Sequence, residues 1–113
     1  MVRIQTYLVG VLFVTAAFLI AVAAQGAGSS QGEELFQEKC AICHGADGKG
    51  NGPAAAAFGK HPADFTKPSF WQGNVDQKIS DTIRNGHPPM PAFSLPPEEI
   101  QAIIKYMKQS FEK

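Results

Sequence analysis

The stretch CAICH at residues 40–44 constrains the fold more than any other feature of this sequence. Two thiols stand three positions apart, and an imidazole follows the second thiol directly. On a helix this spacing sets Cys40 and Cys43 about one turn apart on the same face. The next eight residues, GADGKGNG, contain four glycines. The chain therefore brings three reactive side chains together and then continues as a backbone with few side chains.

The pattern C-x-x-C-H is the attachment sequence of c-type haem. Each thiol adds across one vinyl group of the porphyrin to form a thioether, and the adjacent imidazole then lies against the iron. We therefore predict one haem c, bound covalently through Cys40 and Cys43, with His44 as the first iron ligand. The glycines that follow let the backbone turn tightly under the porphyrin edge, where Cβ atoms would collide.

Three other interpretations of the two cysteines stay open. A structural disulfide between Cys40 and Cys43 fits an oxidising compartment. A thioredoxin-like redox pair needs a βαβ context, which this sequence lacks. A zinc site needs more ligands, and neither His61 nor His87 lies at finger-like spacing from His44.

The first quarter of the chain has the character of a targeting segment. Arg3 gives it a positive start, and the eighteen residues 7–24 carry no charge. Small residues up to Ala24 form a plausible signal-peptidase site, although the apolar run is longer than that of a typical cleaved signal and close to the length that spans a bilayer. Both a cleaved signal and a retained anchor export the remainder of the chain.

These features predict three parts of the chain. Residues 1–24 are a signal peptide or an uncleaved membrane anchor, residues 25–31 are a flexible linker, and residues 32–113 form one small domain. The domain is periplasmic or otherwise exported, soluble if cleavage occurs near Ala24 and membrane-anchored if it does not. Ten basic residues balance ten acidic ones without a basic stripe, which excludes a nucleic-acid binder.

The pattern of apolar residues predicts an all-α domain. A first helix ends near Cys43, residues 45–74 form an irregular loop, and a second helix runs over residues 75–85, capped by Asn74 and ended by Gly86. No stretch alternates well enough to be a strand. The third helix is marked by an apolar stripe at helical period, formed by Ile100, Ile103, Ile104, Met107 and Phe111.

Four side chains are candidates for a second iron ligand. Met90 lies in NGHPPMPAF, where the surrounding prolines restrict the loop and hold one side chain in place. Met90 is therefore the predicted ligand, and His87 is the alternative. Met107 lies on the apolar stripe and is predicted to fill the core. His61 is predicted to be a surface loop residue.

The sequence resembles a class I (mono-haem) c-type cytochrome from Gly32 to about Phe111. The resemblance implies a small cytochrome c-like fold, with three main helices and irregular loops wrapped around one covalently bound haem. The N-terminal apolar segment precedes this domain as a signal or anchor helix. The pieces that carry the resemblance are Gly32 and Phe36 before CAICH, GKGNGP after it, the methionine loop NGHPPMPAF, and EEIQAIIKYM.

The resemblance also implies roles for particular residues. In this family the first and last helices cross near a small residue, with Gly32 and Phe36 matching one side of the crossing and Ile103 and Tyr106 the other. Pro53 matches the family proline whose carbonyl accepts the proton from the second ring nitrogen of the histidine ligand.

Two positions have no clear family counterpart. Pro96 stands where the family has a Ser or Thr helix cap. Trp71 has no assigned haem contact, and its N–H group needs a partner elsewhere if the ring is buried.

The two predicted ligands point to electron transfer. Iron held by His44 and Met90 has no open position for a substrate, so the chain is predicted to be a one-electron carrier and no enzyme. Its partners are a redox donor and a redox acceptor that bind transiently. Two alternatives stay open: a membrane-anchored cytochrome c subunit of a larger oxidoreductase complex, and a haem-based gas sensor in which a gas displaces Met90.

Overall fold

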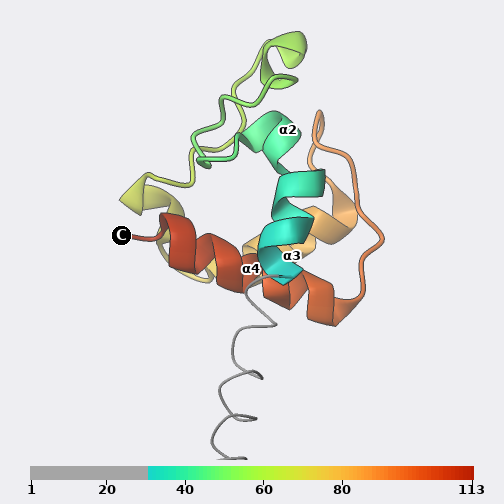
Figure 1. Cartoon of the computed structure of the whole chain (residues 1–113), viewed down its shortest axis with the longest axis vertical. Helices are drawn as coiled ribbons and strands as arrows, with labels where there is room; N and C mark the ends of the chain where they lie inside the picture. The colour runs from blue at the N-terminus through green and yellow to red at the C-terminus, as the bar shows by residue number, and fades with distance from the viewer. Residues whose placement is uncertain (1–30) are drawn as a thin grey trace, which may run out of the picture.

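The computed structural model describes residues 31–113, and these residues are helical with irregular connections (Figure 1). No β-strand occurs within this range, where the only pairing of that kind is an isolated bridge between His87 and Met90. The predicted all-α class is therefore confirmed for the described part. The helical segments, with η for 3-10 helices, are residues 31–39, α2 (Ala41–His44), η1 (Ala55–Phe58), η2 (Pro68–Trp71), α3 (Val75–Asn85) and α4 (Pro97–Phe111).

The predicted signal or anchor segment lies outside the described residues. Residues 1–24 and residues 25–30 of the predicted linker belong to this part of the chain. Within residues 31–113, no helix has both the length and the apolar character needed to cross a membrane.

The last helix, α4, is built as its apolar stripe predicts. Its buried face includes all five residues of the stripe, together with Ala102. The helix begins with Pro97 in its first turn, where the missing N–H group costs no helical hydrogen bond. Glu98 and Glu99 follow in the same turn, where their charges favour the positive end of the helix dipole.

Helix α3 has the predicted bounds but not the predicted cap. Val75, Ile79 and Ile83 are buried on one face, and Gly86 ends the helix with a φ of 72°. The side chain of Asn74 makes no capping hydrogen bond, so the predicted cap is wrong. The Asn74 carbonyl accepts from the Lys78 N–H at 3.2 Å, which is the first hydrogen bond of the helix.

The helix over residues 31–39 lies directly against α4 (Figure 1). A Cβ added to Gly32 would stand 2.0 Å from the carbonyl oxygen of Ala102 and 3.1 Å from the Cβ of Tyr106. Only glycine permits this approach of two helix backbones. The predicted close approach at Gly32 is confirmed for Tyr106, whereas Ala102 rather than the predicted Ile103 is its nearest partner.

A single apolar cluster joins the helices to the long loop. Phe36 is fully buried, and its ring lies 5.4 Å from that of Tyr106 and 5.3 Å from that of Phe111. The buried members of the cluster are Phe36, Phe65, Val75, Ile79, Ile83, Ile100, Ile103, Ile104, Met107 and Phe111.

An ion pair outside the cluster also joins α3 to α4. Lys108 Nζ of α4 lies 3.0 and 3.1 Å from the two carboxylate oxygens of Asp76 in α3.

Candidate functional site

The CAICH residues form one tight turn at the end of the first helix. The N–H groups of Cys43 and His44 both donate to the Cys40 carbonyl, at 3.2 and 2.9 Å. Both cysteines are half-buried free thiols, so the disulfide alternative is not what the structure contains. Cys40 also packs against the apolar cluster. The turn therefore sets two available thiols and an imidazole beside an apolar surface.

Burial controls the protonation of Cys40. It raises the pKa of this thiol from an ordinary value of 9.0 to about 11, and the positive charge of Lys39 offsets only part of the rise. Burial therefore disfavours the thiolate form of Cys40. Within residues 31–113, no group of three or more His, Cys, Asp or Glu side chains comes together as a metal site.

The His44 ring is half-buried against residues 63–65 of the long loop. It stacks on Phe65, with ring centroids 4.6 Å apart and an interplanar angle of 20°. Its Nδ1 lies 3.4 Å from the Ala63 carbonyl oxygen. Burial lowers the pKa of His44, and the Ala63 carbonyl opposes this shift in part. Because a carbonyl only accepts, the contact requires the proton on Nδ1 and leaves the Nε2 lone pair available to a metal.

The structure pairs His44 with Ala63 rather than with Pro53. Among the described residues, no hydrogen bond joins His44 to Pro53, and the proline is exposed. Two backbone hydrogen bonds fix the chain around Pro53 to α2: Gly52 N–H to the Cys43 carbonyl at 3.0 Å, and Ala54 N–H to the Ile42 carbonyl at 2.9 Å. The role that the resemblance gives to Pro53 stays a prediction.

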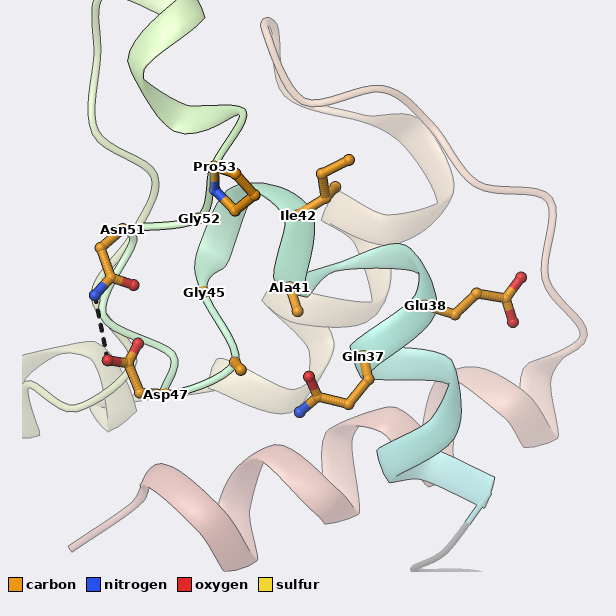
Figure 2. Close-up of a pocket in the computed structure, with 10 residues that line it drawn as sticks. Gln37, Glu38, Ala41, Ile42, Gly45, Asp47, Asn51, Gly52 and Pro53 are labelled. Carbon is orange, nitrogen blue, oxygen red and sulfur yellow. Dashed lines mark hydrogen bonds between the residues drawn. The ribbon is translucent and has the colours of Figure 1, made fainter.

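Pro53 lines an open groove of about 590 Å³ on α2 (Figure 2). Ala41 and Ile42 form part of its apolar surface, and Asp47 and Asn51 join across it through a hydrogen bond of 3.2 Å. Neither cysteine lines the groove, and neither does His44 or Met90. Of the predicted cofactor residues, only Pro53 lines the groove.

The loop after His44 turns through glycines and returns to the histidine. Gly45, Gly48 and Gly50 have φ values of 81°, 72° and 76°, which side chains rarely tolerate. The Gly50 N–H donates to the His44 carbonyl at 2.7 Å. A Cβ on Gly50 would lie 2.5 Å from the carbonyl oxygen of Pro62, so this glycine lets the later part of the loop pack closely.

Met90 lies on a separate loop that is fixed to α3. His87 N–H donates to the Met90 carbonyl at 3.0 Å, and Met90 N–H donates to the His87 carbonyl at 2.8 Å. Phe93 N–H donates to the Ile83 carbonyl at 2.7 Å, which ties the loop to α3. The Met90 side chain is half-buried against the same apolar cluster as Cys40. The structure thus brings Cys40, Cys43 and His44 into one turn and places Met90 on another segment of the same core.

Met107 and His61 lie where the sequence predicts them. Met107 is 3% exposed within the core, so its predicted packing role is confirmed. His61 and His87 are both exposed. Trp71 is half-buried, and its Nε1–H donates to the Phe65 carbonyl at 2.7 Å, which supplies the partner that its N–H group needs.

Comparison with known families adds an independent observation. The family described as "Cytochrome C oxidase, cbb3-type, subunit III" matches residues 27–107. The chain belongs to this family of class I c-type cytochromes. Membership supports haem-based electron transfer as the chemistry of this cytochrome.

Three curated relatives are similar to the cytochrome over most of its length. The cbb3-type cytochrome c oxidase subunit CcoP of Rubrivivax gelatinosus is 34% identical over 80 residues, which are 67% of this chain and 24% of that protein. A cytochrome c-553-like protein of Synechocystis sp. is 28% identical over 86 residues, 71% of this chain and 67% of the relative. Cytochrome c-551 of Bacillus subtilis is 33% identical over 83 residues, 72% of this chain and 62% of the relative. No solved structure matches the chain significantly.

The residues present in the cytochrome fit a haem c. Both thiols are free, and the structure places them within one turn, as attachment to two vinyl groups requires. The imidazole next to them keeps Nε2 available, and the turn lies beside the apolar cluster against which Cys40 packs. The donor set therefore matches haem better than it matches zinc or a disulfide.

Proposed function

We propose that this cytochrome carries one electron at a time between redox proteins outside the cytoplasm. One haem c is attached through Cys40 and Cys43, and His44 and Met90 are the two axial ligands of its iron. The observation that carries the proposal is the CAICH turn, with two free thiols and a half-buried imidazole against the apolar core, in a chain of this family.

The proposed ligands favour electron transfer over catalysis. When bound, the haem supplies a one-electron couple at iron, and a His/Met pair leaves no position for a substrate. A thioether ligand raises the reduction potential compared with a second histidine. Phe93 and Leu95 pack against the same cluster as Met90, and such apolar neighbours disfavour the more charged ferric state. Backbone hydrogen bonds fix the loop that carries Met90, which favours a small structural change between the two oxidation states.

The proposed partners are a redox donor and a redox acceptor. Transient electron-transfer complexes have small interfaces, of under about 1,200 Å². Residues 1–24 direct the chain across the membrane, which places the domain in the periplasm or an equivalent exported compartment. Cleavage near Ala24 releases a soluble carrier.

A second candidate is a membrane-anchored subunit of a larger oxidoreductase complex. It is favoured by the description of the matching family and by the similarity to CcoP over 80 residues. The N-terminal sequence of the mature protein separates the two functions. Retention of residues 1–24, together with co-purification of a larger complex, favours the subunit.

The proposal is tested on protein made with haem-maturation machinery. We expect a mass that includes one haem, a visible spectrum with the far-red methionine–iron band, and a reversible one-electron titration. Met90→Ala should keep the covalent haem, lose that band and shift to lower potential. Met107→Leu is the matched control, because Met107 is a core methionine, and it should keep the band.

Each part of the proposal has an outcome that contradicts it. A mass equal to that of the bare polypeptide refutes covalent attachment. A band that survives in Met90→Ala refutes the ligand. Prompt binding of carbon monoxide by the native ferrous protein refutes the closed iron site and favours a gas sensor.

A further inference from the structure

The groove on α2 has an apolar centre and carboxylates at its ends (Figure 2). Ala41, Ile42 and Pro53 supply the apolar surface. Ile42 is 55% exposed, and it is one of two large apolar side chains exposed to solvent in the part of the chain that the structure describes. Glu38 and Asp47 stand at opposite ends of the groove, with Ala41 between them. An exposed apolar side chain flanked by charged ones is typical of a surface that docks another protein.

The segment that supplies most of the groove is acidic. Residues 31–48 carry four carboxylates and one ammonium group, whereas residues 49–113 carry eight basic and six acidic side chains. The single base of the first segment, Lys39, does not line the groove, and its Nζ lies 3.2 Å from Glu38 Oε1. The Glu38 side chain stays 66% exposed beside this pair. The groove therefore presents negative charge to an approaching molecule, although the whole chain is neutral.

Two hydrogen bonds fix the carboxylate of Asp47 in place and in its ionised form. Its Oδ1 accepts from the Lys49 N–H at 3.1 Å, and its Oδ2 accepts from the Asn51 side-chain amide at 3.2 Å. The Lys49 N–H, and then the Asn51 amide, hold the pKa of Asp47 below its ordinary value of 3.8. Asp47 is therefore fully charged at neutral pH, and its position does not depend on a flexible side chain.

We propose that this groove docks a cationic, partly apolar surface of a redox partner, with Ile42 as the apolar contact and Glu38 and Asp47 as the charged contacts. The inference rests on the proposed function, because Ala41 and Ile42 lie between the two cysteines that attach the haem. A partner seated on the groove is next to the covalent link to the cofactor. One electron then passes from ferrous haem to the acceptor of the partner, and no bond forms or breaks. Complementary charge mainly raises the rate of association.

Two inorganic oxidants of opposite charge test this surface on the reduced, haem-loaded protein. Tris(phenanthroline)cobalt(III) is a trivalent cation with flat apolar rings, so it has both properties expected of the partner. Hexacyanoferrate(III) is a trivalent anion. Each accepts one electron from ferrous haem, so that cobalt(III) becomes cobalt(II) and hexacyanoferrate(III) becomes hexacyanoferrate(II). Their second-order rate constants, measured by stopped flow at about 10 mM ionic strength, report the charge at the place where the electron leaves the protein.

Asp47→Asn and Glu38→Gln should each slow oxidation by the cobalt complex about fourfold, which is the effect of one charge on a trivalent ion about 10 Å away in water. Both should make oxidation by hexacyanoferrate faster. At about 1 M salt the differences should disappear, because the Debye length is then about 3 Å. Ile42→Ser should slow oxidation by the cobalt complex alone.

The matched control is Glu98→Gln. It removes the same charge from the first turn of α4, and Glu98 does not line the groove. Both rate constants should stay within about 1.5-fold of the wild-type values. Glu38→Gln also guards against a folding defect in Asp47→Asn, because the Glu38 side chain takes no part in the turn that Asp47 closes.

The outcomes separate this inference from the proposed function. Wild-type rates with the cobalt complex in both Asp47→Asn and Glu38→Gln, with an intact methionine–iron band, overturn the docking surface. An equal loss in Glu98→Gln overturns it as well, because the effect is then one of net charge. A dimer that forms with rising protein concentration, and that Ile42→Ser abolishes, overturns the partner in favour of a second copy of this chain. A wild-type protein without covalent haem overturns the proposed function, and the docking surface with it.

Discussion

Phe36 is the residue whose truncation tests the described core most directly. Its side chain is fully buried, and three rings surround it: Tyr106 at 5.4 Å, Phe111 at 5.3 Å and Phe65 at 6.3 Å. Phe36→Ala removes the ring from the point where the first helix, the long loop and α4 meet. The substitution changes no charge and no hydrogen bond, so its effect is one of packing.

The expected loss is large relative to the total stability. Truncation of a buried Phe to Ala costs about 3–5 kcal/mol. The three ring contacts place Phe36 in the upper part of this range, at about 4 kcal/mol or more, because each aromatic pair contributes beyond its buried area. A domain of this size has a free energy of unfolding of about 4–12 kcal/mol. At about 4–8 °C per kcal/mol, the Tm should fall by at least about 16 °C.

The measurement is thermal unfolding of the haem-loaded protein by far-ultraviolet circular dichroism. The matched control is Phe58→Ala, which removes the same ring from a side chain that is 49% exposed. Its expected cost is under about 0.5 kcal/mol. Equal falls in Tm for the two variants would refute the burial of Phe36 in the core. Both substitutions remove the same ring, and the two rings differ in how far they are buried.

Three further predictions follow from single contacts. Gly32→Ala places a Cβ 2.0 Å from the Ala102 carbonyl oxygen and should cost about 1–3 kcal/mol; an unchanged Tm contradicts the close crossing. Lys108→Ala breaks the exposed pair with Asp76 and should cost no more than about 1 kcal/mol of stability; a larger loss means the pair is a structural link. Hydrogen bonds from the Thr66 hydroxyl, and then from its N–H, hold the pKa of Asp64 below 3.8. Its stabilisation is therefore complete above pH 3.8 and lost as the pH falls through the lower folded-state pKa. Asp64→Asn should flatten that part of an acid-unfolding curve, and identical curves for both proteins contradict the pKa shift.

The helices could be predicted because their signals are local. The apolar stripe from Ile100 to Phe111 and the face of Val75, Ile79 and Ile83 have helical period, and both helices lie where that period places them. The prediction that the Asn74 side chain caps α3 is wrong, because residue type alone does not fix backbone geometry. With φ −86° and ψ 58°, the backbone of Asn74 lies outside the extended region typical of a capping residue, and its side chain makes no capping hydrogen bond.

The surroundings of His44 could not be predicted in the same way. The CAICH motif identifies the imidazole, but Ala63 contributes only a backbone carbonyl, which has no signature in the sequence. The path of residues 45–74 depends on contacts between distant positions, such as Gly50 with Pro62 and Trp71 with Phe65. Phe65 is one of several aromatic residues in this loop, and its stacking on His44 follows from that path alone.

The placement of Trp71 gives this cytochrome its own optical probe. The chain contains one tryptophan, so all indole fluorescence comes from a ring hydrogen-bonded to the Phe65 carbonyl at 2.7 Å. A nearby porphyrin quenches such emission by energy transfer, and solvent shifts it to longer wavelength. Release of the loop around residue 65 should therefore increase the intensity of the tryptophan emission and shift its maximum to longer wavelength. No label has to be attached to the protein.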